Sequence, residues 1–120
     1  MNKIDQETFP ISRSAQPFAG EHIDDCDMVA ARTVANAEAL LAERVTPERA
    51  AHDANECSLA FAALPSEQLG QLYLVGQMLA IATVNWVRHR DTPQGDGWRK
   101  ITKELSAFAR ETSQRAHGRG

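Results

Sequence analysis

Two histidine–cysteine pairs are the residues of this 120-residue chain that come nearest to a chemical motif. His22 and Cys26 stand four residues apart, and His52 and Cys57 stand five apart. Two histidines and two cysteines are a common ligand set for structural zinc. In a helical hairpin that turns near residue 45, however, the two cysteines would lie roughly 10 Å apart along the axis. The five-residue step also turns His52 away from Cys57. We therefore expect no metal site, and two thiols that act as small hydrophobic side chains in a reducing compartment, although a disulfide stays possible.

Other catalytic or cofactor-binding motifs are missing from the sequence. The acidic cluster of Asp24, Asp25 and Asp27 lacks the glycine turn and distal glutamate of a calcium loop, so we interpret it as charge that favours the start of a helix. There is neither a Gly-x-Ser-x-Gly elbow nor a phosphate-binding glycine loop, and the histidines are scattered. Because nucleophilic catalysis needs a nucleophile beside a base, we expect no enzymatic activity and no cofactor.

The longest uncharged stretch of the chain, Gln68 to Val87, needs other helices around it. It predicts a third helix over about 66–89, with Ser66 or a neighbour as its cap. A helix that is apolar all round has to be covered on more than one side. A small-residue side holds Leu72, Gly76, Leu79, Ala80 and Thr83, and a bulkier side holds Leu74, Met78, Ile81 and Asn85. The first two helices can cover one side, which leaves the last helix or a second protein chain for the other.

Three further segments predict helices, so we expect an all-α fold, a small four-helix bundle with an extended N-terminal arm. The first helix should run from about Glu21 to Arg44, and the second from about Pro47 to Ala63 behind the N-cap Thr46. The short break predicts an antiparallel hairpin. The expected inner face of its second helix is Ala50, Ala54, Cys57, Phe61 and Leu64.

The fourth helix should follow a loop over residues 91–97, with Asp96 as its cap. Its expected inner face is Trp98, Ile101, Leu105 and Phe108, and its opposite face carries Arg99, Lys100, Lys103 and Arg110. From Thr112 the chain turns polar. We therefore divide it into an arm (1–20), a helical domain (21–115) and a flexible tail (116–120).

The N-terminal arm contains apolar side chains that a solvated tail does not need. Pro10 and Pro17 prevent a continuous helix, yet Phe9 and Phe18 are large and aromatic. Two interpretations stay open. One aromatic ring rests on the bundle, or the arm becomes ordered on a neighbouring subunit or partner.

Charge is unevenly distributed along the chain, whose net charge is −3. Residues 21–63 carry nine acidic and three basic side chains, and residues 88–120 carry eight basic and four acidic ones. Either the two segments lie against each other in the fold, or they form a polar contact surface. Direct nucleic-acid binding is not expected, because the third helix has no charge with which to contact bases or phosphates.

Because the sequence disfavours enzymatic activity, metal binding and direct nucleic-acid binding, we expect the chain to function by protein–protein association. We predict a partner-binding set that consists of Tyr73, Leu74, Met78, Ile81, Asn85, Trp86, Arg88 and Arg90, with Phe9 and Phe18 from the arm. Tryptophan can equally be a core residue, and arginines at the end of a helix can serve its dipole. We expect Trp86→Ala or Met78→Asp to abolish association and to leave the helix content unchanged. Four amides in the uncharged stretch disfavour a membrane span, and no secretory signal is visible, so a cytoplasmic location is expected.

In size and in its run of helical segments the chain resembles the quorum-sensing antiactivators of bacteria. The segment from Leu64 to Tyr73, its continuation through Trp86 and the alanine-rich first hairpin carry this resemblance, which extends over most of residues 21–115. It implies a homodimeric helical protein that binds the ligand-binding domain of a LuxR-type transcription factor and blocks its dimerisation and DNA binding. Phage anti-defence and immunity proteins are alternatives with a similar composition. A DNA-associated regulator that uses the basic fourth helix is another.

Overall fold

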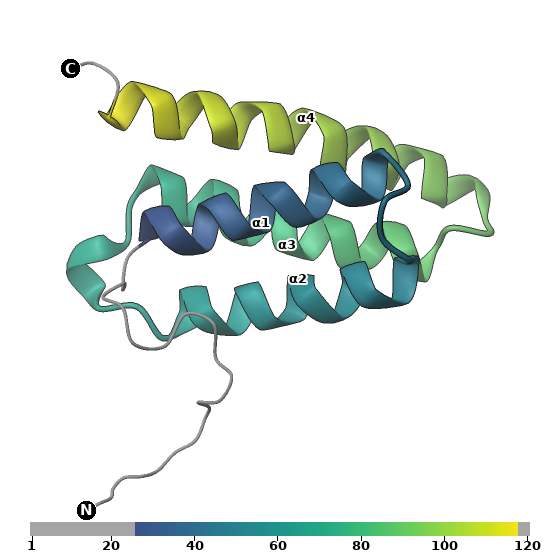
Figure 1. The fold of residues 1–120 in the computed structure, drawn as a ribbon, viewed down its shortest axis with the longest axis horizontal. Helices are drawn as coiled ribbons and strands as arrows, with labels where there is room; N and C mark the ends of the chain where they lie inside the picture. Colours follow the sequence, from purple (N-terminus) through teal and green to yellow (C-terminus); the bar gives the residue numbers. More distant parts are fainter. Residues whose placement is uncertain (1–25, 118–120) are drawn as a thin grey trace, which may run out of the picture.

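Four α-helices form the structure, a computed structural model that describes residues 26–117 (Figure 1). They are α1 (Cys26–Leu41), α2 (Pro47–Ala62), α3 (Gln71–Arg88) and α4 (Pro93–His117), with a short 3-10 helix, η1 (Ser66–Gln68), before α3. The expected all-α, four-helix architecture is confirmed. The arm, including Phe9 and Phe18, lies outside the described residues.

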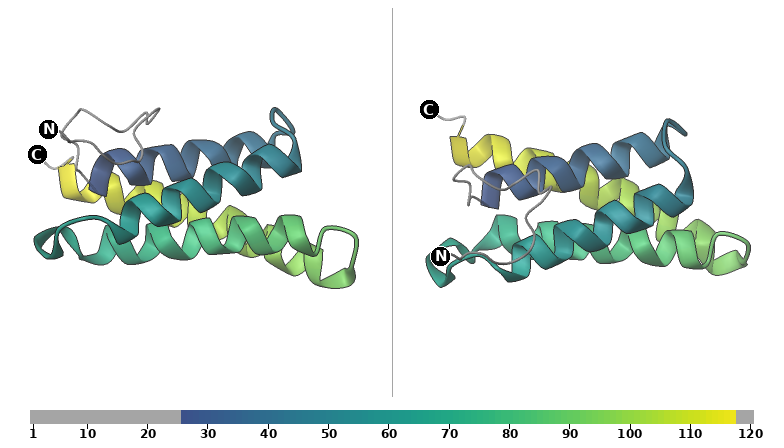
Figure 2. Two further views of the ribbon diagram at one scale, coloured as in Figure 1. Left: turned by 90° about the horizontal axis from the view of Figure 1, so that it is seen from below. Right: turned by 60° about the horizontal axis from the view of Figure 1, so that its bottom comes forward.

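The helices pack so that α1 and α3 lie in the middle, with α2 and α4 on either side (Figures 1 and 2). The α1–α2 and α3–α4 hairpins are each antiparallel, and α1 contacts all three other helices. Within residues 26–117, no helix is long and apolar enough to cross a membrane.

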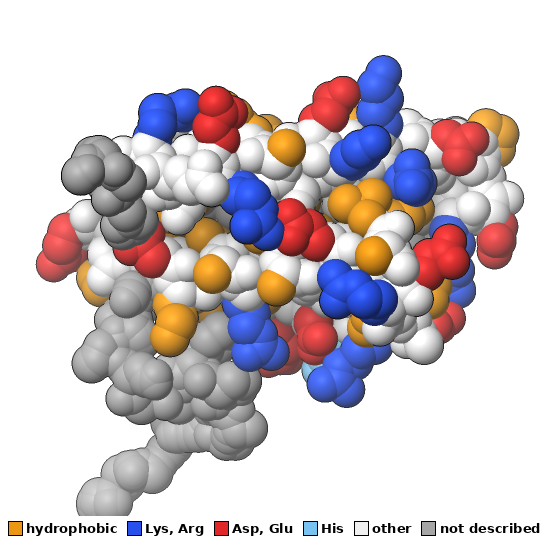
Figure 3. Space-filling view, turned by 45° about the horizontal axis from the view of Figure 1, so that its top comes forward, with side chains coloured by type: hydrophobic (Ala, Val, Ile, Leu, Met, Phe, Trp, Pro, Cys, Tyr) orange, Lys and Arg blue, Asp and Glu red, His pale blue; other side chains and the backbone are white. Residues whose placement is uncertain are grey.

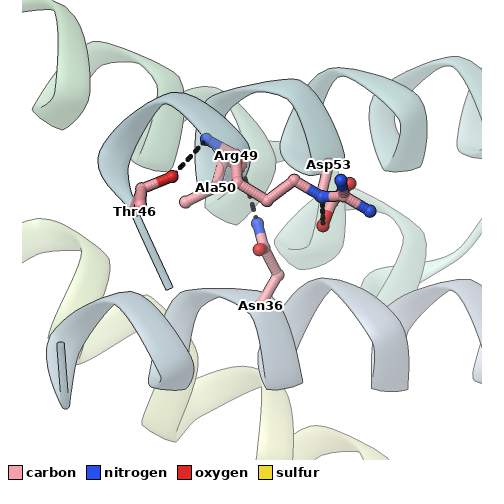
Figure 4. A network of polar contacts seen from close by, with 5 residues as sticks. All are labelled: Asn36, Thr46, Arg49, Ala50 and Asp53. Carbon is pink, nitrogen blue, oxygen red and sulfur yellow. Dashed lines mark hydrogen bonds and ion pairs between the residues drawn. The ribbon is translucent and has the colours of Figure 1, made fainter. Parts of the chain in front are cut away.

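The turn between α1 and α2 is fixed by local signals in the sequence. The backbone N–H of Arg49 donates to the Thr46 hydroxyl at 3.1 Å, which caps α2 as expected (Figure 4). The Asn36 amide of α1 donates to the carbonyl of Ala50 at 2.9 Å and joins the two helices. Helix α1 ends at Leu41, three residues before the expected end, because Glu43 adopts a left-handed φ of 58° that no continuing helix allows.

The inner face of α2 is confirmed and contains the largest fully buried side chain. Ala50, Ala54, Cys57 and Phe61 are buried, and Leu64 is half-buried. The ring of Phe61 lies directly over Gly76 of α3, where an added Cβ would overlap it. Glycine is therefore required at position 76 so that the ring can pack against the α3 backbone.

The start of α3 differs from the expectation. Ser66 begins a separate 3-10 helix, and α3 starts only at Gln71, with Gly70 as an N-cap that has no side chain to bond. Leu69 and Gly70 are both extended, which breaks the predicted 66–89 helix. The side chain of Gln68 contributes to this break, because its Oε1 accepts a hydrogen bond from the backbone N–H of Cys26 at 2.7 Å.

Helix α4 is longer at both ends than expected. It starts at Pro93 rather than near Asp96, since proline is well suited to the first turn of a helix. Gly95 lies against the carbonyl of His89, where a Cβ would collide, so this glycine allows α4 to begin close to the end of α3. At the other end α4 continues to His117, past the expected domain boundary at 115, and Thr112 is buried in the fold.

The inner face of α4 is also not the expected one. Its buried residues are Gly95, Thr102, Ser106, Ala109 and Thr112. Trp98 and Leu105 are half-buried, whereas Ile101 and Phe108 are 41% and 37% exposed. At about 100° per residue this corresponds to a rotation of α4 by roughly 60° from the orientation that its apolar stripe predicts. The small buried side chains allow α4 to pack close, with Ala109 in one cluster with Val34 and Ala37 of α1.

Candidate protein-binding surface

The bulky side of α3 is not covered by the other helices. Leu74, Met78 and Ile81 are 58%, 52% and 52% exposed. The small-residue side is covered, since Gly76, Leu79, Ala80 and Thr83 are buried, while Leu72 is half-buried. The packing of one chain therefore leaves three large apolar side chains of the same helix in solvent.

This exposed side of α3 lies between the flank that contacts α2 and the flank that contacts α4. Gln77 marks the α2 flank, because the Ser58 hydroxyl donates to its Oε1 at 2.8 Å. Leu79 marks the α4 flank, where it packs in one cluster with Ala109. By the helical period, Met78 and Ile81 fall in the sector between these two markers and face away from α1.

Helix α4 adds two apolar side chains next to this sector. Leu105 packs on the cluster that contains Leu79, and Ile101 and Phe108 lie beside Leu105 on the helical wheel. Arg110 lies on the opposite flank, where it pairs with Glu38 of α1. Ile101 and Phe108 are therefore on the side of α4 that borders the exposed sector of α3. We refer to these five exposed residues as the α3–α4 apolar surface: Leu74, Met78, Ile81, Ile101 and Phe108.

The two aromatic residues of α3 that are predicted for partner binding also pack within the chain. Tyr73 is half-buried and meets the ring of Phe61 edge-on, with ring centroids 5.9 Å apart. Trp86 is half-buried against the cluster around Leu40, and the guanidinium of Arg99 lies 5.9 Å from its ring centroid. Replacing Trp86 would thus disturb the packing of the chain as well as any interface, and Met78 is the cleaner residue for a test.

The polar residues predicted at the end of α3 have different surroundings. Arg90 donates to Glu48 of α2 at 2.9 Å and to the carbonyl of Val87 at 2.8 Å, so it is used within the chain. The Asn85 amide donates to the carbonyl of Ile81 at 3.1 Å. Arg88 is exposed and makes no ion pair with any residue of the 26–117 range.

The acidic and basic segments of the chain are connected by ion pairs between described residues. They are Glu48–Arg90 and Glu38–Arg110, the second with two hydrogen bonds at 2.5 and 3.1 Å. The hydrogen bonds to Glu38 raise the pKa of Arg110. Figure 3 looks onto α4 and α1, where basic and acidic side chains are interspersed. This arrangement fits the interpretation that the two segments lie against each other.

The cysteines and histidines are not arranged as a metal site in the described part of the chain. Cys57 is buried, and desolvation raises the pKa of its thiol. Cys26 and Cys57 are both present as thiols. Among residues 26–117, no three His, Cys, Asp or Glu side chains are grouped so that they could hold a metal ion. His22 lies outside this range.

Comparisons with known proteins add no relative. No protein-family model, no curated protein and no solved structure matches the chain.

Sequence reasoning identified part of this surface and missed part of it. The spacing of Leu74, Met78 and Ile81 predicted a separate face of the third helix, and these side chains are exposed together. Ile101 and Phe108 belong to the apolar stripe of the fourth helix, but an apolar stripe does not specify how far a helix rotates when it packs. Three hydroxyl residues, Thr102, Ser106 and Thr112, are buried on α4 instead, and a polar residue carries no periodic signal for burial.

Proposed function

We propose that this chain is a non-enzymatic regulator that binds another protein through the α3–α4 apolar surface. The observation that carries the proposal is the exposure of three large apolar side chains on one side of α3, next to two more on α4. Adjoining exposed apolar side chains mark interaction sites more often than isolated ones do. Methionine and leucine are suited to such a surface, and methionine adapts its shape to a partner.

The candidate partner is the ligand-binding domain of a LuxR-type transcription factor, which the sequence resemblance suggests. A receptor of this kind that dimerises by burying an apolar patch is inhibited by any protein that covers the patch first. An interface of ordinary size buries about 800 Å² on each partner. The outward side of α3 and the neighbouring flank of α4 form a continuous platform for such a contact. Competition for one patch would keep the receptor from dimerising and from holding DNA.

Self-association of this chain is the second part of the proposal. A second copy that covers the α3–α4 apolar surface would give a homodimer in the absence of a target. In that case the target competes with the second copy, and formation of the complex depends on the concentration of the chain.

Light scattering on a size-exclusion column tests the proposal with a matched pair of variants. Met78→Asp places a charge in the α3–α4 apolar surface, and Leu59→Asp places the same charge on α2, where Leu59 is 67% exposed and outside this surface. We expect Met78→Asp to abolish the complex with the receptor domain and the homodimer, because it would bury an unpaired carboxylate. Leu59→Asp should leave both unchanged. Circular dichroism checks that both variants keep their helix content.

Two results would count against the proposal. A chain that is monomeric and does not bind the receptor domain removes both proposed partners. Binding that persists in Met78→Asp moves the interface away from α3.

A further inference from the structure

A groove lined by both polar and apolar side chains adjoins the α3–α4 apolar surface at the C-terminal end of α3. It has a volume of about 220 Å³ and lies between α2 and α3. Its lining includes Asn55 and Ser58 of α2 and Ile81, Asn85 and Arg88 of α3. Ile81 belongs to both the groove and the apolar surface, so a partner that covers the apolar side chains reaches the groove without a gap.

Two hydrogen-bond donors of this groove are without partners in the described part of the chain. The exposed amide of Asn55 makes no hydrogen bond with residues 26–117, and the guanidinium of Arg88 makes neither a hydrogen bond nor an ion pair there. Ser58, in contrast, is bonded to Gln77. Other arginines of the bundle are paired, such as Arg49 with Asp53 and Arg110 with Glu38.

A ligand group that satisfies both donors is a hydrogen-bond acceptor, and the positive charge of Arg88 favours one with negative charge. A carboxylate accepts hydrogen bonds from a guanidinium and from an amide at the same time. The C-terminal end of α3 is the negative end of its helix dipole, so it repels an anion. The charge of Arg88 has to outweigh this repulsion, which makes Arg88 the residue on which carboxylate binding depends.

The dimensions of the apolar strip fit a helix as the occupant. Leu74 and Ile81, the first and last apolar side chains of this strip on α3, are seven residues apart, which corresponds to about 10 Å, or two helical turns. An amphipathic helix meets such a strip with apolar side chains at steps of three and four residues. Its next turn would lie over the groove.

We propose that the chain binds an amphipathic helix of its partner that carries a carboxylate about one turn beyond its apolar residues. Leu74, Met78 and Ile81 contact the apolar side of this helix, and Arg88 with Asn55 binds the carboxylate. This inference rests on the proposed function, because it names the partner element that the α3–α4 apolar surface accepts.

Selection from a peptide library tests this inference without knowledge of the partner. The probe is a phage-displayed library of helical peptides of about 20 residues. Leucines are fixed at i, i+4 and i+7, and the remaining positions are randomised. The full chain is the immobilised target. We expect the selected peptides to share an Asp or Glu at one position beyond the leucines.

Fluorescence anisotropy then measures the affinity of one selected peptide for three variants. Arg88→Glu should weaken binding at least about tenfold, since a hydrogen bond to a charged group typically contributes this much or more. A peptide in which the shared acid is replaced by lysine should bind Arg88→Glu better than it binds the unchanged chain. The control, Lys103→Glu, makes the same change of charge at an exposed site on the α1-facing flank of α4 and should have no effect. Met78→Asp should abolish binding of every selected peptide.

The possible failures can be told apart. Peptides that require Met78 but show no shared acid, or that ignore Arg88→Glu, overturn the carboxylate inference and leave the protein-binding function standing. Peptides that bind equally well to Met78→Asp, or the absence of any selected peptide, overturn both.

Discussion

The two helical hairpins of this chain differ in how many large apolar side chains they expose, namely Met28 and Leu59 in α1–α2 and five in α3–α4. In α1–α2 the large apolar side chain Phe61 points inward. At the turn, the Thr46 hydroxyl accepts a hydrogen bond from the backbone N–H of Arg49, and the Asn36 amide donates one to the carbonyl of Ala50. In α3–α4 five large apolar side chains point outward. Helix α4 meanwhile buries the hydroxyl groups of Thr102, Ser106 and Thr112, which have no hydrogen-bond partner within residues 26–117.

This difference separates a hairpin that leaves few large apolar side chains in solvent from one that leaves several there. Buried hydroxyls without partners reduce the stability of a fold, and exposed apolar side chains contribute little to it. Helix α4 has both features because of its rotation. The α1–α2 hairpin thus provides a packed base, and the outward side of α3–α4 remains available for another molecule.

The largest expected effect is the loss of the ring that joins the first hairpin to α3. Phe61→Ala should lower the free energy of unfolding by about 3–5 kcal/mol, because it leaves a cavity over Gly76. Leu59→Ala, two residues earlier on α2, should change it by less than about 0.5 kcal/mol, because that side chain is exposed. Urea denaturation followed by circular dichroism measures both. Equal effects would contradict the assignment of α2's inner face.

A smaller effect of the opposite sign is expected on α4. Thr102 and Thr83 are both buried threonines in helices. Among the described residues, only the Thr83 hydroxyl of these two has a partner, the carbonyl of Leu79 at 2.8 Å. Thr102→Val should therefore raise the free energy of unfolding by about 1 kcal/mol. Thr83→Val should give no such gain. The same denaturation experiment decides between them, and a loss of stability in Thr102→Val would mean that its hydroxyl has a partner after all.

The smallest expected effect on the unfolding free energy comes from the buried thiol of α2. It is absent near neutral pH and develops at alkaline pH. Burial raises the pKa of Cys57 above that of the unfolded chain, so the unfolded chain releases its proton first as the pH rises. The stabilisation is complete below the unfolded pKa and is lost as the pH rises through the folded pKa. The unfolding free energy should thus decline at alkaline pH, above the usual thiol pKa of about 8.5. Cys57→Ala should decline less steeply over that window, and identical slopes would show that other groups cause the decline.

The sequence predicted the first hairpin better than the second, for a physical reason. Thr46 followed by Pro47, and the spacing of Ala50, Ala54, Cys57 and Phe61, are local signals that act within one helix. The rotation of α4 depends on how closely three helices approach each other, which no single helix encodes. The break before α3 was missed because Leu69 is apolar and continues the uncharged pattern, although Gly70 beside it was a signal for an interruption.

For the candidate site, the sequence predicted which residues share a face of α3, but it did not predict which side chains those residues contact. The grouping of Leu74, Met78 and Ile81 on one side of α3 followed from periodicity, whereas their exposure depends on how α4 packs. The separate environments of Arg88, which is unpaired in the described range, and Arg90, which pairs with Glu48, depend on α2, whose acidic side chains lie about forty residues earlier. Such pairings come from tertiary structure.

The contact between Phe61 and Gly76 also bears on the ancestry of this chain. The ring occupies the space of a side chain at position 76, so the two positions cannot change independently during evolution. A lineage that keeps the aromatic ring has to keep the glycine, and a lineage that replaces the glycine has to reduce the ring. Two distant chains with the same fold would therefore show a joint change at these two sites even where little else in their sequences still agrees.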